Sequence, residues 1–319
     1  MKMLIAGGAG YIGSRLVPFL AELGHDVTVL DLLWFGNNLP SNIPVIQKDV
    51  FDITDNDVQG YDIVIFLAGL SNDPMAEYAP SMNFIANASA PSYLAYISKR
   101  AGVKKFIYAG TCSVYGYTQN QELDEESPTI SNYPYGISKL QGEFGVMRLA
   151  DSSFSVICLR QGTLSGYSTR MRFDLLVNTM YMKAMTEGKI TVNNPVIWRP
   201  LLAMTDLLEA YKSIIERNDT ESSVINLSSE NVTIGQAASE VKNFFKESFK
   251  KDIAIETKNI PDMRNYKVSN TRAKTMLNMP FTGNINTILH ELGKHIDTDF
   301  DFMNDKHYNI KIFKKTFRE

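Results

Sequence analysis

Three glycines at intervals of three residues follow the first apolar run of the chain. Met3–Ala6 has the length and composition of a buried strand, and Gly7, Gly10 and Gly13 come directly after it. Such a turn requires backbone angles that a Cβ disfavours, and it lets a phosphate approach the main chain closely. A helix is expected at Tyr11–Leu23, directly after the turn. The strand, the glycine turn and this helix together predict the dinucleotide-binding unit of an open α/β sheet.

An acidic residue beyond the turn indicates which dinucleotide binds there. Asp31 follows the apolar strand Val27–Leu30. A carboxylate at this point can accept hydrogen bonds from both adenosine ribose hydroxyls, and it would repel the 2′-phosphate of NADP. The expected cofactor is therefore NAD, although a glycine turn alone can also simply join a strand to a helix. The first predicted contacts are Gly7, Gly10, Tyr11, Ile12, Gly13 and Asp31.

The first half of the chain alternates short apolar runs with helical patterns, which predicts β-α-β units and a parallel sheet. Further strands are expected at Val45–Gln47, Ile63–Leu67, Phe106–Ala109 and Ser155–Leu159, and helices at Ser81–Ala101 and Tyr133–Leu149. We therefore predict an α/β, Rossmann-like doubly wound parallel sheet. Ligands of such sheets bind beyond the carboxyl ends of the strands.

The second half is less regular. After the loop-like stretch Gln161–Asp174, helices are expected at Leu175–Glu187 and Leu207–Arg217, and strands at Val224–Leu227 and Ile253–Glu256. We predict that residues 1–165 and about 203–230 form the NAD-binding domain. Residues of about 166–202 and 231–297 would form a smaller interleaved α/β substrate-binding lobe. The tail, 298–319, has no clear period, so partial disorder and docking on a neighbour are both open.

Composition argues against several classes of protein. The net charge of −3 gives no basic footprint for nucleic acid. No apolar stretch approaches the roughly 18 residues of a membrane span, and the first apolar run is too short for a cleavable signal. The cysteines, Cys112 and Cys158, imply no disulfide framework and a reduced, cytoplasmic protein. The four histidines show no metal-ligand spacing, so no metal is expected.

The most specific chemical pattern is Tyr135 followed by Lys139 near the start of a predicted helix. Residues four apart lie on one helical face, where an ammonium group favours the phenolate form of a tyrosine and makes it a base. A surface Tyr-Lys pair is the alternative. Thr111 stands upstream at the carboxyl end of a predicted strand, where a hydroxyl faces the cofactor crevice.

Together these segments resemble the extended short-chain dehydrogenase/reductase family, particularly its NAD-dependent nucleotide-sugar epimerases and dehydratases. The matching pieces occur in order over residues 1–210, and the stretch from Pro261 to Asn270 extends the match. They are GGAGYIGS, Asp31, Asp49-Val50, Leu67-Ala68-Gly69, Asn87, TCSVYG, YGISK and Trp198-Arg199-Pro200 with Asp206.

The resemblance implies a role for each matched residue. Tyr135 would be the catalytic acid/base, Lys139 would lower its pKa and bind the nicotinamide ribose, and Thr111 would hold the sugar hydroxyl. Further NAD contacts are implied at Asp49, Val50, Leu67, Ala68, Gly69 and Asn87. The predicted substrate contacts are Ser71, Asn72, Thr111, Ser113, Arg172, Asn178, Arg199 and Arg264. Arg199 and Arg264 would grip the diphosphate, with structural salt bridges as the alternative.

One departure from the family pattern bears on the reaction. The 4,6-dehydratases follow the threonine with Asp and Glu, whereas Cys112 and Ser113 stand here, which disfavours dehydration. Cys112 is either a reactive thiol or core packing. The resemblance implies NAD-dependent oxidoreduction at C4 of a nucleoside diphosphate sugar, and we rank a 4-epimerase with a transient 4-keto intermediate first.

Two other functions remain open. One is a 4-dehydrogenase or 4-keto reductase, for example on a GDP-heptose-like sugar in surface polysaccharide biosynthesis; the other is a non-catalytic NAD-sensing protein. The family also implies a homodimer formed by four-helix packing of the segments Ser81–Ala101 and Tyr133–Leu149.

Overall fold

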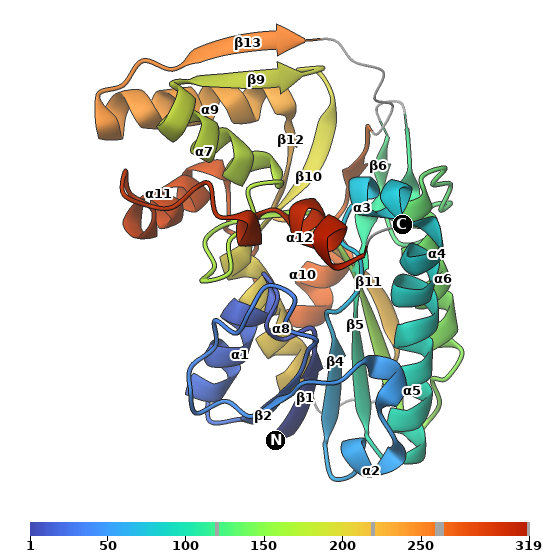
Figure 1. Cartoon of the computed structure of the whole chain (residues 1–319). Coiled ribbons are helices and arrows are strands. Elements are labelled where there is room, and N and C mark those ends of the chain that lie inside the picture. Colours follow the sequence, from blue (N-terminus) through green and yellow to red (C-terminus); the bar gives the residue numbers. More distant parts are fainter. Residues whose placement is uncertain (119–120, 218–220, 259–264, 318–319) are drawn as a thin grey trace.

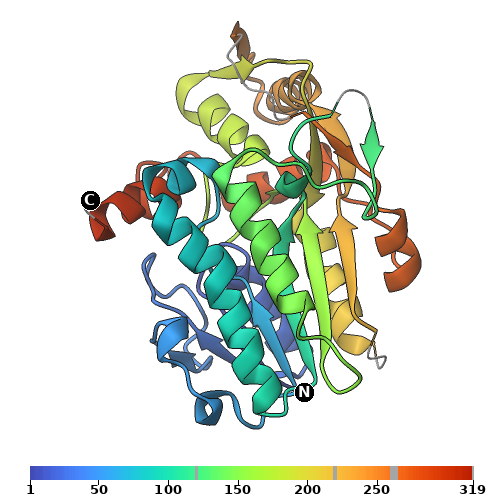
Figure 2. The ribbon, with the colours of Figure 1, turned by 90° about the vertical axis from the view of Figure 1, so that its right-hand side faces the viewer.

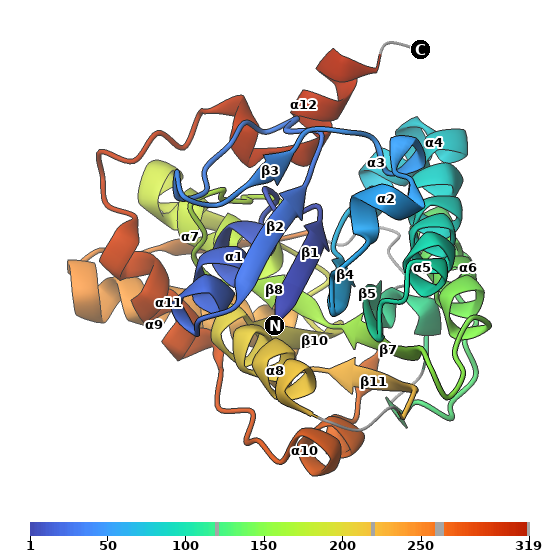
Figure 3. The same ribbon diagram turned by 90° about the horizontal axis from the view of Figure 1, so that it is seen from below.

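A parallel sheet organises the fold. The computed structural model describes residues 1–118, 121–217, 221–258 and 265–317, and within them seven parallel strands form one sheet in the order β11-β7-β5-β4-β1-β2-β3 (Figure 3). The strands are β1 (Lys2–Ala6), β2 (Asp26–Leu30), β3 (Val45–Ile46), β4 (Ile63–Phe66), β5 (Lys105–Thr111), β7 (Ser155–Gln161) and β11 (Ser223–Leu227). This confirms the Rossmann-like α/β class.

Side chains that alternate along each strand fill two cores, one on each face of the sheet. On one face of the sheet, Ile5 and Ile65 pack with Leu16 of α1 (Gly13–Glu22). Helix α8 (Met204–Glu216) contributes to the same core. Leu4 and Phe66, one residue along in each strand, pack on the opposite face beneath α5 (Ala90–Arg100) and α6 (Pro134–Met147). The near-continuous apolar strands therefore follow from burial on both faces (Figure 1).

The expected helix Ser81–Ala101 is divided in three. It consists of α4 (Pro80–Phe84), a π-helical turn over Ile85–Ser89, and α5. The shorter helices nearby are α2 (Asp55–Val58) and α3 (Asp73–Tyr78). A π turn inserts an extra residue into a helix and often marks a functional site. Here it contains Asn87, one of the predicted NAD contacts.

A second layer lies above the carboxyl ends of the main sheet (Figure 1). Its strands are β8 (Thr163–Ser165), β10 (Trp198–Ala203) and β12 (Glu230–Thr233) in one sheet, and β9 (Lys189–Asn193) with β13 (Ala254–Lys258) in another. Its helices include α7 (Leu176–Glu187), α9 (Ile234–Phe249) and α11 (Ile285–His295). The remaining elements are β6 (Glu122–Leu123), β14 (Lys267–Val268) and α10 (Thr271–Leu277). The domain boundaries expected from the sequence stay a prediction.

The tail adopts an arrangement that the sequence did not predict. Its helix α12 (Asn309–Thr316) packs on α3 of the same chain. Phe313 is fully buried, with its ring centroid 5.9 Å from that of Trp34 and 6.0 Å from that of Tyr78. The described part of the tail is therefore an ordered element that folds back over the main body. Figure 2 shows it beside the upper end of the α4–α5 helix.

Neither cysteine forms a disulfide, and both are buried. A cytoplasmic location stays a prediction. Among the helices of the described ranges, none combines the length and apolar character needed to cross a membrane.

Candidate active site

A cavity of about 950 Å³ opens at the carboxyl ends of β1, β2, β4 and β5, beneath the second layer. It lies where the sheet order reverses, because the chain runs from β1 outward to β3 and then returns to place β4 on the other side of β1. This is the position at which open α/β sheets bind ligands. The volume is at the upper end of the roughly 300–1,000 Å³ of small-molecule sites.

The glycine turn forms one wall of this cavity. Gly7, Gly10, Tyr11 and Ile12 line it, whereas Gly13 packs behind them, where a Cβ would collide with the backbone of Gly8. Gly7 has a φ of +80°, and a Cβ there would come within 2.5 Å of the Ala68 nitrogen. The turn thus brings bare main chain and the start of α1 to the cavity wall, as a pyrophosphate requires.

Asp31 lies at the end of β2 on the same wall. One carboxylate oxygen accepts a hydrogen bond from the Ala9 nitrogen at 2.9 Å, and the other accepts from the Leu33 nitrogen at 2.7 Å. Burial raises the pKa of this carboxyl group, and the two hydrogen bonds oppose that rise. The carboxylate is therefore fixed in position where an adenosine ribose would lie. Asp49 and Val50 line the cavity beyond it.

The loop after β4 forms the opposite edge. Leu67, Ala68 and Gly69 line the cavity, whereas Asn87 is fully buried behind them. The Asn87 amide donates to the Leu70 carbonyl oxygen at 2.9 Å and lies within 3.2 Å of the Ser138 hydroxyl oxygen. Its placement favours support of the cofactor loop over the direct NAD contact that was predicted.

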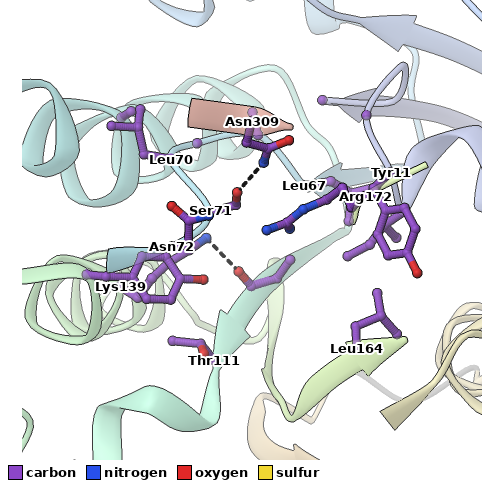
Figure 4. A pocket seen from close by; sticks show the side chains of 18 of the residues that line it. Tyr11, Leu67, Leu70, Ser71, Asn72, Thr111, Lys139, Leu164, Arg172 and Asn309 are labelled. Carbon is purple, nitrogen blue, oxygen red and sulfur yellow. Dashed lines mark hydrogen bonds between the residues drawn. The ribbon is translucent and has the colours of Figure 1, made fainter. Parts of the chain in front are cut away.

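Thr111, Tyr135 and Lys139 all line the cavity, and Tyr135 and Thr111 are joined by a hydrogen bond between their side chains. Figure 4 shows Thr111 and Lys139 at the same end of the cavity. Thr111 is the last residue of β5, and Tyr135 and Lys139 lie in the first two turns of α6. The Lys139 ammonium donates to the Ala109 carbonyl oxygen at 2.9 Å and lies 5.0 Å from the centroid of the Tyr108 ring. The three residues that the sequence predicted as catalytic are thus brought together from two elements.

Burial opposes ionisation of both catalytic groups. It raises the pKa of Tyr135 to about 12 and lowers that of Lys139 to about 8. The pKa of about 12 for Tyr135 already includes the lowering by Arg172 and, after it, by the hydrogen bond with Thr111. Arg172 is therefore a cation that favours the phenolate here, and the same influence of Lys139 stays a prediction.

Arg172 is held in a short chain of polar contacts across the cavity. Its guanidinium donates two hydrogen bonds to Asp174, both 2.9 Å long. Asp174 also accepts a hydrogen bond from the Asn72 amide at 2.8 Å. Figure 4 shows the Arg172 side chain between Tyr11 and Asn72. The loop after β4 and the second layer are thus joined beside Tyr135.

The predicted substrate contacts do not all face the cavity. Ser71, Asn72, Thr111, Ser113, Arg172 and Arg199 line it. Asn178 is fully buried in α7, where its amide lies 3.0 Å from the Tyr11 hydroxyl and 2.9 Å from the Arg172 carbonyl oxygen. We therefore assign Asn178 a supporting place instead of the expected contact. Arg264 lies outside the described residues.

Cys112 is part of the core beside the site. Its thiol donates to the Arg160 carbonyl oxygen at 3.0 Å, and the side chain is fully buried. Burial raises the pKa of this thiol, so the reactive thiolate is disfavoured. Of the two alternatives left by the sequence, the structure favours packing.

Several cavity residues were not predicted. Arg170 and Asp174 lie on either side of Arg172 in the stretch Gln161–Asp174. The charged residues at every second position there were the available sequence signal. Trp34 and Phe35 follow Asp31, and Asn309 and Phe317 come from the tail. The tail has no sequence period that points toward a site, so these last contacts depend on the tertiary fold.

The fold and this cavity are those of the dinucleotide-binding class of α/β proteins. A family model described as the NAD dependent epimerase/dehydratase family matches residues 3–228, and the chain belongs to this family. It is therefore an NAD-dependent enzyme. The glycine turn, the fixed Asp31 carboxylate and the cavity between them fit that cofactor.

Individual curated relatives match only part of the chain, and at low sequence identity. The chain is 29% identical over 154 residues to UDP-glucose 4-epimerase of Corynebacterium glutamicum, covering 47% of each chain. It is 28% identical over 159 residues to dTDP-glucose 4,6-dehydratase of Streptomyces niveus, covering 45% of this chain and 47% of the other. The matches thus span about half the length of these curated relatives.

A solved structure shares the fold over nearly the whole chain. MoeE5 in complex with UDP-glucuronic acid and NAD superposes with a TM-score of 0.80 and 22% identity, covering 91% of this chain and 97% of the other. At that identity the likeness establishes the fold alone.

Proposed function

We propose that this protein is a nucleoside diphosphate sugar 4-epimerase that works through a transient 4-keto sugar. The observation that carries the proposal is that Thr111, Tyr135 and Lys139 line one cavity together with the glycine turn. The family and the epimerase of Corynebacterium glutamicum support this choice.

The side chains have distinct tasks in the proposed reaction. Tyr135, as phenolate, takes the proton of the sugar C4 hydroxyl and returns it when the ketone is reduced. Thr111 donates a hydrogen bond to the same oxygen, and Lys139 and Arg172 stabilise the negative charge on Tyr135. NAD, which the glycine turn and the Asp31 carboxylate would hold, would supply the hydride acceptor and, once reduced, the hydride donor.

Elimination of water is the less favoured reaction. A dehydratase needs an acid and a base next to the sugar, in addition to the tyrosine. The residues after Thr111 are Cys112, whose thiol is bonded to a carbonyl oxygen within the core, and Ser113, a neutral hydroxyl. Neither is suited to that work at neutral pH. Likeness to a dehydratase therefore does not extend to these positions.

The second candidate is an enzyme that oxidises C4 of the sugar and does not reduce the ketone again. If the 4-keto sugar leaves the cavity, the enzyme is a 4-dehydrogenase, and the reverse reaction makes it a 4-keto reductase. The charged pocket residues Arg172 and Asp174 favour a polar substituent on the sugar, as in the sugars of surface polysaccharides. A non-catalytic NAD sensor is disfavoured because Thr111, Tyr135 and Lys139 are all present.

The test is incubation of the purified protein with UDP-, GDP-, dTDP- and CDP-sugars. NMR identifies the product, and near-ultraviolet absorbance reports released NADH. A sugar inverted at C4 without net NADH supports the epimerase, whereas a keto sugar with stoichiometric NADH supports the dehydrogenase. Tyr135→Phe should lower kcat by about 10²–10⁴-fold while NAD binding persists. Unchanged turnover in that variant would exclude the mechanism.

A further inference from the structure

Arg170 is a buried cation on the cavity wall that the proposed reaction does not use. Its side chain is only 2% exposed and lines the cavity. In the described part of the chain, its Nη2 donates a hydrogen bond to the neutral Asn309 amide oxygen. Within the described residues, its Nε has no hydrogen-bond partner. A buried charge without a compensating partner is costly, so a guanidinium that has no ion-paired carboxylate within the described residues is suited to an anionic ligand.

The segment that carries Arg170 is fastened to the glycine turn. The Ser168 hydroxyl donates to the Tyr11 carbonyl oxygen at 2.8 Å, and the Tyr11 hydroxyl donates to the Gly166 carbonyl oxygen at 2.6 Å. Both contacts are buried. Arg170, two residues beyond Ser168, is therefore held next to the turn where a pyrophosphate lies.

A second loop fixes the guanidinium from the other side. The Arg170 guanidinium lies 3.6 Å from the centroid of the Phe35 ring, in the loop that follows Asp31. Asp31 itself is already bonded to the Ala9 and Leu33 nitrogens, so its carboxylate has other partners. Arg170 is thus held between the segment fastened to the glycine turn and the loop that follows Asp31.

We propose that Arg170 binds the pyrophosphate of NAD from the side opposite the glycine turn, and that Asn309 of the C-terminal helix positions it. The planar guanidinium can donate two parallel charge-assisted bonds to phosphate oxygens. Asn309 also donates to the Ser71 hydroxyl at 2.5 Å, which ties α12 to the loop after β4 (Figure 4). The tail then acts on the cofactor through Arg170.

The electrostatics agree with an anion at this place. Burial and the neighbouring Arg172 together lower the pKa of Arg170 to about 9, whereas Asp174 and Asp31 oppose that change. A pyrophosphate between the turn and Arg170 adds the negative charge that favours the protonated guanidinium.

The experiment measures ligand binding to Arg170→Gln and needs no sugar substrate, so its outcome is independent of the proposed epimerase activity. Isothermal titration with NAD, ADP and adenosine separates the pyrophosphate from the base and ribose. We expect about 10–100-fold weaker binding of NAD and ADP, because hydrogen bonds to charged groups are lost. Adenosine should bind as before, and Arg170→Lys should lose less.

Other outcomes would overturn the proposal. Unchanged ADP affinity would exclude the pyrophosphate contact, and weaker binding of adenosine to the same degree as ADP would make the effect structural. A selective loss of 2′,5′-ADP binding would assign Arg170 to a ribose 2′-phosphate. Selective loss of UDP binding would assign it to the substrate.

The tail is tested separately, which also covers the case in which Arg170→Gln fails to fold. Asn309→Ala should weaken ADP binding several-fold, leave adenosine binding unchanged, and lower the NAD content of the purified protein. Met303→Ala, an exposed position in the same segment, is the matched control. Equal NAD content and equal ADP affinity in both variants would exclude the role of Asn309.

Discussion

At the scale of single residues, Arg172 is the side chain whose charge most directly favours the Tyr135 phenolate. Arg172→Gln removes that charge, so the Tyr135 pKa rises. Activity that requires the phenolate increases as pH rises through this pKa. The rising limb of kcat/KM against pH should therefore move to higher pH. Arg172→Lys keeps the charge and should shift the rising limb of kcat/KM less. A rising limb at the same pH in the wild type and both variants would contradict the effect of Arg172 on the Tyr135 pKa.

Asp31 offers a second residue-scale test, of cofactor preference. Its carboxylate is held at the end of β2 by two backbone nitrogens and would repel a 2′-phosphate. Asp31→Ala should raise the affinity for NADP relative to NAD by about tenfold, or about 1.4 kcal/mol. Titration of both cofactors measures the ratio, with the exposed Asp52→Asn as control. A wild-type preference for NADP would overturn this interpretation.

At the scale of elements, Asn87 joins three parts of the site. Its amide donates to the Leu70 carbonyl oxygen and lies near Ser138 of α6, while its own helix contributes Asn83. Asn87→Ala leaves buried polar groups without partners, so the free energy of unfolding should fall by roughly 1–3 kcal/mol. NAD affinity should fall too, because the loop over Gly69 and Leu70 loosens.

Urea unfolding and NAD titration test this prediction. Ser89→Ala lies in the same π-helical turn, on its exposed side, and should change neither quantity. If Asn87→Ala were as stable as wild type and bound NAD equally well, the proposed support of the cofactor loop would be wrong.

At the scale of the whole molecule, α5 and α6 pack side by side (Figure 2), and each carries an exposed large apolar side chain. Tyr96 is 49% exposed and Phe144 is 57% exposed. We propose that this face forms the four-helix dimer interface that the sequence predicted. Sedimentation velocity at micromolar concentration should show a dimer, and Phe144→Glu should shift it to monomer. Val196→Glu, on the second layer, is the control; a monomeric wild type would contradict the proposal.

The sequence by itself determined the parts of this protein whose signals are local. The glycine turn, Asp31, the apolar strands and the ordered set Thr111, Tyr135 and Lys139 each depend on short-range rules of backbone geometry and strand or helix periodicity. Strand ends of a parallel sheet meet at one edge, so these residues were expected to converge, and they lie around one cavity.

Only the tertiary structure decided which polar groups face that cavity and what covers it. Asn87 and Asn178 are turned into the interior, whereas Arg170 lines the cavity and contacts Asn309, 139 residues away in the chain. The tail has no periodicity that indicates its partner, because it is ordered by contacts of Phe313 with Trp34 and Tyr78 from distant segments. Such contacts depend on the packing of the whole chain, which no local pattern encodes.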